Sequence, residues 1–67
     1  MRWVLINRAY FNIDHIQTFY WTAGNLSIWL QGEETAEVYD DPHRENYLRL
    51  CHNVGVRPLE EDGHGQG

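Results

Sequence analysis

The chain has 67 residues, of which 42% are hydrophobic and 22% charged, and ten acidic against five basic residues give a net charge of -5 with histidine neutral. This size predicts one small soluble domain, and the composition excludes a strongly basic nucleic-acid module, a disulfide-linked toxin and a membrane span. A domain of this size buries only about 60% of its unfolded surface, so we expect it to gain stability from an aromatic core or from a second subunit.

Residues 1–39 are predicted to form short strands joined by tight turns. The expected strands cover residues 3–6, 9–13, 16–21, 26–31 and 35–39. Asn7-Arg8 marks the first turn, and Asn12 begins a bend in which asparagine and aspartate side chains can bond their own backbone. Ala23-Gly24-Asn25 marks a hairpin turn, and the charges of the fifth strand suit the edge of a sheet.

A helix is predicted over residues 42–54. Asp41 can cap its N-terminus, and Pro42 suits the first turn. One helical face carries apolar residues at positions i, i+3, i+4 and i+7, which are Tyr47, Leu50, Cys51 and Val54. Gly55 follows where a left-handed residue ends a helix.

These elements predict a small α+β domain, in which an antiparallel meander of four to five strands has one C-terminal helix packed on one face. Residues 1–57 form this single domain, and residues 58–67 form an acidic, glycine-rich C-terminal tail that we expect to be mobile. The N-terminal apolar run is too short for a signal peptide, and a lone cysteine is typical of a reducing compartment. We therefore expect a cytoplasmic location.

The hairpin around Ala23-Gly24 has two different faces. A loop of Ala23-Gly24 or of Gly24-Asn25 gives the same face assignment, because the two registers differ by two residues. The core face carries Phe19, Trp21, Leu26, Ile28 and Leu30. The opposite face carries Ile16, Thr18, Tyr20, Ser27, Trp29 and Gln31. This second face is aromatic and uncharged, so either it is an interface or the first two strands fold back over it.

No residue pattern in the chain indicates catalysis or metal binding. The six acidic residues between positions 33 and 45 match no calcium loop and suit a solvated edge and a helix N-terminus. His43 and His52 are nine positions apart, so they lie out of phase on the predicted helix. Cys51 falls on the apolar helix stripe, which favours an inert buried thiol. We therefore predict no catalytic residue, no metal site and no cofactor.

The segment from Asn7 to Ile16, Asn-Arg-Ala-Tyr-Phe-Asn-Ile-Asp-His-Ile, resembles the strand-and-bend segment of LytTR-type bacterial DNA-binding domains. The resemblance implies that Arg8 contacts DNA and that Asn12 corresponds, at or within one residue, to the asparagine of that family. Ala9 stands where the family has serine, and few basic residues are available to neutralise phosphates.

The favoured hypothesis is a non-enzymatic protein-interaction or assembly module of a bacterial-type cytoplasm, which forms a homo-oligomer, most simply a dimer, or binds another protein. Its interface residues would be Ile16, Thr18, Tyr20, Trp29 and Gln31. The second hypothesis is a nucleic-acid-binding regulatory module that uses Arg8 and Asn12. The third is an enzyme whose active site is shared between subunits, because a chain this short has little room for a pocket of its own.

Overall fold

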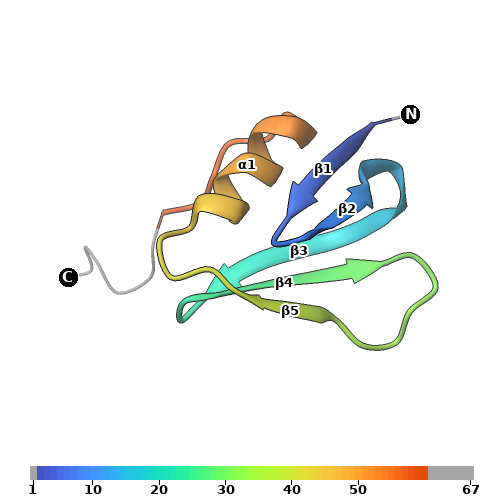
Figure 1. The fold of residues 1–67 in the computed structure, drawn as a ribbon, viewed down its shortest axis with the longest axis horizontal. Helices are drawn as coiled ribbons and strands as arrows, with labels where there is room; N and C mark the ends of the chain where they lie inside the picture. Colours follow the sequence, from blue (N-terminus) through green and yellow to red (C-terminus); the bar gives the residue numbers. More distant parts are fainter. Residues whose placement is uncertain (1, 61–67) are drawn as a thin grey trace.

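Short strands and a C-terminal helix make up the described part of the computed structural model, residues 2–60 (Figure 1). The strands are β1 (Trp3–Ile6), β2 (Ala9–Asn12), β3 (Ile16–Thr22), β4 (Asn25–Leu30) and β5 (Glu37–Asp40). The helix is α1 (Glu45–Val54), and a single 3-10 turn, η1 (Ile13–His15), separates β2 from β3. The arrangement confirms a small α+β fold with antiparallel strands and a C-terminal helix.

The strands form two antiparallel sheets instead of one continuous meander. β1 pairs with β2 in a hairpin, and β3, β4 and β5 form a three-stranded sheet in that order. The chain leaves the first sheet at Asn12, whose side-chain oxygen accepts a hydrogen bond of 3.0 Å from the backbone N–H of Asp14. This bond favours the 3-10 turn over further strand, because it satisfies a backbone donor locally.

The β3–β4 hairpin closes through a tight two-residue loop. Thr22 pairs with Asn25, so Ala23 and Gly24 form the loop, as one of the two sequence registers predicts. Their φ angles of 52° and 82° are both in the left-handed region that such a turn requires. Alanine adopts this region less readily than glycine does, so the loop carries some backbone strain at Ala23.

The β1–β2 hairpin and α1 cover the same face of the three-stranded sheet (Figure 1). Phe11 of the hairpin contacts Tyr39 of β5 edge-to-face at 5.9 Å, and Tyr47 of α1 contacts Phe19 of β3 at 6.0 Å. The buried core comprises Val4, Ile6, Phe11, Ile13, Leu26, Ile28, Tyr47, Leu50 and Cys51. The first two strands therefore do not fold over the opposite face of the sheet.

The helix begins three residues later than the sequence pattern predicts. Arg44 has a φ of 62°, which is left-handed and so cannot continue a helix backwards towards Pro42. Asp41 still serves the helix, because its buried carboxylate accepts bonds of 3.0 and 2.9 Å from the backbone N–H groups of Asn46 and Tyr47. The helix ends as predicted at Gly55, whose φ is 94° and whose N–H bonds the carbonyl of Cys51.

After the helix, the chain returns along α1. The backbone N–H of Leu59 donates to the hydroxyl of Tyr47 at 2.9 Å, and the Arg44 guanidinium donates to the carbonyl of Leu59. The mobility expected of the tail concerns mainly residues 61–67, which lie outside the described residues. Within residues 2–60, no helix is long and apolar enough to cross a membrane.

Candidate functional site

The outer face of the three-stranded sheet is the side that the hairpin and helix leave uncovered. The strand register puts Tyr20 of β3, Ser27 of β4 and Val38 of β5 in one row across this face. Thr18 and Trp29 form the next pair along the strands. Tyr20 is 46% exposed and Val38 59% exposed, which is high for large hydrophobic side chains in a sheet. We call these five residues the outer-face patch.

Two aromatic rings form the centre of the outer-face patch. The rings of Tyr20 and Trp29 meet edge-to-face, with centroids 5.7 Å apart and planes at 85°. They come from diagonal positions on neighbouring strands, where long side chains can reach one another. This geometry is the favourable one for aromatic pairs, so the two rings fix each other on the surface.

The outer-face patch contains no charged side chain. The acidic residues predicted to gather at the fifth strand lie around it, with Glu37 and Asp40 in β5 and Glu33 and Glu34 in the preceding loop. Asp40 shares the face at its far end, in the row of Thr22 and Asn25. The patch is therefore a neutral, apolar area on a molecule with a net charge of -5.

The structure brings together only some of the residues that the sequence assigned to this face. Thr18, Tyr20 and Trp29 are adjacent, whereas Ile16 pairs with Leu30 and packs against the core. A β-bulge between Ile16 and Thr18 inserts one extra residue, Gln17, and so reverses the side on which Ile16 lies.

Two further differences concern the ends of the face. Gln31 is exposed just beyond the end of β4, and its backbone N–H donates to the carbonyl of His15. Val38 belongs to the patch but is missed by the sequence reasoning, because the length of the β4–β5 loop leaves the register of β5 open. One feature of the sequence could have indicated Val38: it is an apolar side chain among charged and polar neighbours in the fifth strand.

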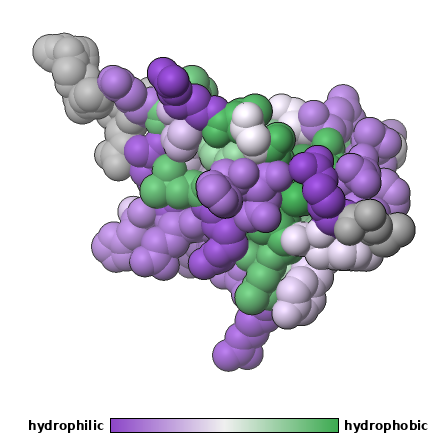
Figure 2. Space-filling model, turned by 90° about the horizontal axis from the view of Figure 1, so that it is seen from above, coloured by the Kyte–Doolittle hydropathy of each residue, from purple (hydrophilic) through white to green (hydrophobic). Residues whose placement is uncertain are grey.

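A second apolar area lies on the outward side of the β1–β2 hairpin. Trp3, Leu5 and Tyr10 are 52%, 40% and 70% exposed, and Leu5 pairs with Tyr10. Figure 2 looks down on α1 and the hairpin and shows hydrophobic side chains that reach the surface between hydrophilic ones. Arg49 of α1 donates to the carbonyl of Leu5 at 3.1 Å, so the hairpin is tied to the helix beside this area.

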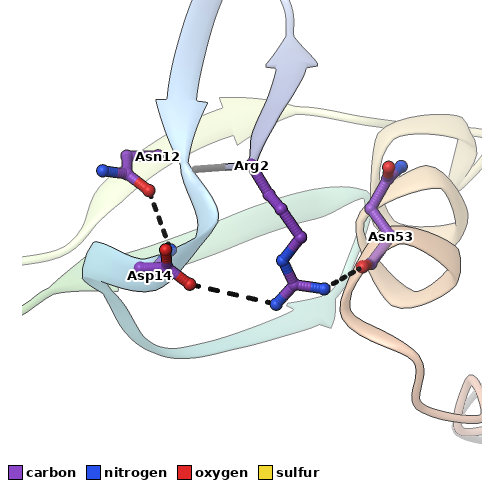
Figure 3. Close-up of polar contacts among 4 residues, drawn as sticks. All are labelled: Arg2, Asn12, Asp14 and Asn53. Carbon is purple, nitrogen blue, oxygen red and sulfur yellow. Dashed lines mark hydrogen bonds and ion pairs between the residues drawn. The ribbon is translucent and has the colours of Figure 1, made fainter.

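The two residues of the nucleic-acid hypothesis lie at opposite ends of β2. Arg8 is exposed in the turn between β1 and β2. Asn12 already uses its side-chain oxygen to hold Asp14, which also lies 3.9 Å from the Arg2 guanidinium (Figure 3). Asn12 therefore has a local structural role in the turn that follows β2.

The cysteine, the potential metal ligands and Tyr39 are the ionisable side chains of residues 2–60 that bear on the chemistry of the fold. Cys51 is 1% exposed in the core, in agreement with the expected buried thiol. No group of three or more His, Cys, Asp or Glu side chains in residues 2–60 could hold a metal ion. His64 lies outside these residues. Burial and the nearby Glu37 carboxylate raise the pKa of Tyr39, whose hydroxyl donates to Glu37 Oε1 at 3.3 Å.

Comparisons with protein-family models, with curated proteins and with solved structures found no match to this chain.

Proposed function

We propose that the protein is a non-enzymatic interaction module of the cytoplasm that forms a dimer through its outer-face patch. The observation that carries the proposal is the Tyr20–Trp29 pair, in which Tyr20 is exposed and Trp29 half-buried, on a sheet face that no described element covers. Apolar patches with aromatic centres mark protein interfaces, because aromatic side chains bury much area with few rotatable bonds. Thr18 and Val38 extend the patch. Gln31, which follows the end of β4, would lie at its rim in the proposed dimer.

The absence of charge on the patch favours a second copy of the chain as its binding partner. In a symmetric dimer the same patch meets itself, so any charge on it would repel an identical charge. The patch is neutral while the molecule carries a net charge of -5, and this makes it a surface on which two copies can meet with little repulsion. Two sheets packed face to face also give a small domain more buried surface.

The experiment measures molar mass against protein concentration by sedimentation equilibrium. We expect the wild type to change from monomer to dimer as concentration rises. Val38→Asp should remain monomeric, because it places a desolvated charge in the interface. Tyr10→Asp is the matched control, since Tyr10 is 70% exposed on the hairpin and lies outside the patch. It should dimerise like the wild type.

Two results would overturn the proposal. One is a wild type that stays monomeric at the highest concentration at which it is soluble. The other is a Val38→Asp variant with the same dimerisation constant as the Tyr10→Asp variant. Far-ultraviolet circular dichroism checks that all three proteins have the same secondary structure, and both substituted residues are exposed, so we expect little effect on folding.

A further inference from the structure

Strand β3 has one free edge. It pairs with β4 on one side, and Thr22↔Asn25 closes the hairpin, so the main chains of Thr18, Tyr20 and Thr22 bond towards β4. The N–H and C=O groups of Phe19 and Trp21 then point away from β4. Within residues 2–60, the structure records no hydrogen bond to the main chain of either residue. These groups can accept another strand.

Beyond the β-bulge at its start, this edge lacks charge, proline and short length, which are the other usual protections against strand pairing. β3 is seven residues long and contains no charged residue and no proline. The opposite edge of the sheet, β5, carries Glu37 and Asp40 in only four residues. Charges and short length at an edge discourage pairing with other chains, so the two edges of this sheet differ in what they permit. β3 is the edge that is open to pairing.

A hollow follows the free edge of β3. It has a volume of about 420 Å³, and five consecutive residues of β3, 16–20, line one side of it. Successive side chains of a strand point to opposite faces, so a hollow that touches five in a row runs along the backbone edge. The other wall is made by Tyr47, Cys51 and Val54 of α1 together with Val56 and Leu59. A second hollow of about 400 Å³ continues along residues 20–22.

The first hollow is apolar with positive charge at its border. Among residues 2–60, Arg2 and Arg57 line it, and no acidic residue does. Arg2 reaches across from the start of β1 to α1, where its guanidinium donates to the carbonyl of Asn53 at 3.3 Å, and it lies 3.9 Å from Asp14 (Figure 3). The Arg2–Asp14 pair is more than half exposed, so it is weak and leaves Arg2 able to attract a further carboxylate.

We propose that this groove binds an extended peptide segment of another protein, which carries both apolar side chains and carboxylates. The peptide adds to β3 as a strand and bonds the main chains of Phe19 and Trp21. Its apolar side chains enter the space between β3 and α1, and its carboxylates lie near Arg2 and Arg57. The free edge of a second β3 is a poorer occupant, because β3 brings no carboxylate to these arginines.

Thr18 and Tyr20 belong both to the outer-face patch and to the lining of this groove. The contacts proposed here are made by the main chain of β3, however, so the test follows amides at the β3 edge and does not depend on dimerisation. A phage-displayed library of short random peptides is selected against the wild-type protein, and an enriched sequence is made as a capped peptide. We expect enriched sequences to combine apolar and acidic residues. On binding, the amides of Phe19 and Trp21 should become protected from hydrogen exchange. The amide of Val38, on the free edge of β5, is the matched control and should not change.

Two further comparisons distinguish strand pairing and charge attraction from non-specific hydrophobic binding of the peptide. Methylation of alternate backbone nitrogens of the peptide should weaken binding by about tenfold, since it removes two hydrogen bonds. Arg57→Glu should weaken it by about fivefold, whereas Arg8→Glu makes the same charge change in the β1–β2 turn and should leave affinity unchanged.

Three outcomes would overturn the proposal. The first is a library that yields no enriched sequence. The second is a methylated peptide that binds as tightly as the unmethylated one, because the contact would then not be strand pairing. The third is protection of the Phe19 and Trp21 amides that rises with protein concentration in the absence of peptide, which would assign the edge to a second copy.

Discussion

Asp41 is the residue on which the start of the helix depends. Its side chain is buried, and its two carboxylate oxygens accept the backbone N–H groups of Asn46 and Tyr47. Its own carbonyl accepts the indole N–H of Trp21 at 2.7 Å. One residue therefore holds the first turn of α1 and the end of β3 together.

We expect Asp41→Ala to lower the free energy of unfolding by about 2–3 kcal/mol, because it leaves two N–H groups at the helix start without their acceptor. Urea denaturation measured by tryptophan fluorescence gives this value. Asp40→Ala, at the exposed neighbouring position, is the control and should change stability by less than about 0.5 kcal/mol. Equal losses in the two variants would contradict the role given to the Asp41 carboxylate.

The fold alters the acid–base behaviour of Tyr39. Burial first, and the Glu37 carboxylate second, raise its pKa above the ordinary value of 10.0. We expect Glu37→Gln to lower the pKa of Tyr39, since it removes the negative charge that opposes phenolate formation. The phenolate absorbance of Tyr39 is obtained by subtracting the titration of a Tyr39→Phe variant. Glu34→Gln, in the preceding loop, should leave this titration unchanged.

The raised pKa also has a consequence for stability. The folded state holds the Tyr39 proton more tightly than the unfolded state does, so this contribution to stability is complete below pH 10.0. It is lost as pH rises through the higher folded-state pKa. Glu37→Gln should reduce the decrease in the free energy of unfolding at alkaline pH. An unchanged decrease would mean that Glu37 does not act on Tyr39.

Among the elements, η1 decides that there are two sheets instead of one. Its first backbone donor, the N–H of Ile13, donates to the carbonyl of Arg2 at 2.9 Å, and the second, the N–H of Asp14, is satisfied by the side chain of Asn12. The chain therefore turns away from β1 and β2 as soon as they are paired.

We expect Asn12→Ala to lower the free energy of unfolding by about 1 kcal/mol, as the loss of other capping side chains does. Asn12→Asp keeps a side-chain acceptor and should retain most of the stability. Thermal unfolding followed by circular dichroism checks both variants. If Asn12→Asp is destabilised as much as Asn12→Ala, the hydrogen bond to Asp14 is not what fixes the turn.

The periodicity of apolar residues predicted most elements well. A buried face takes every second residue of a strand and every third or fourth residue of a helix. The alternation from Leu26 to Leu30 and the apolar stripe from Tyr47 to Val54 both became core surfaces. The assignment of Ile16 to the outer face did not hold, because one inserted residue at Gln17 reverses a strand and leaves no mark in composition. The pairing of β2 with β1 alone depended on one local hydrogen bond, which periodicity does not record.

For the outer-face patch, the sequence placed the central residues on the correct face but not all of those at its ends. Tyr20 and Trp29 follow from the hairpin register alone, since the loop fixes which residues are opposite. Val38 enters from a strand that follows a longer loop, whose register only the folded structure determines. The groove beside β3 needed the position of α1 and of the segment after it, and neither is a local property of the sequence.

At the scale of the whole molecule, the earliest and latest described elements meet. Arg49 of α1 bonds the carbonyl of Leu5 in β1, and Arg2 bonds the carbonyl of Asn53 (Figure 3). These pairs are separated by 44 and 51 residues in the sequence. The three-stranded sheet between them is held by contacts that are close in sequence.

This closure has a consequence for the nascent chain. The β3–β5 sheet can form as soon as its residues are synthesised, because hairpin contacts are local and form quickly. The β1–β2 hairpin is made earlier and can cover part of the inner face, but the part that α1 covers stays open until α1 has been made. Until then, Leu26 and Ile28 of the sheet are not packed against Leu50 of α1, with which they share the core of the folded protein. Synthesis of α1 is therefore the step that completes the cover of this apolar surface, and a delay before that step prolongs its exposure to aggregation.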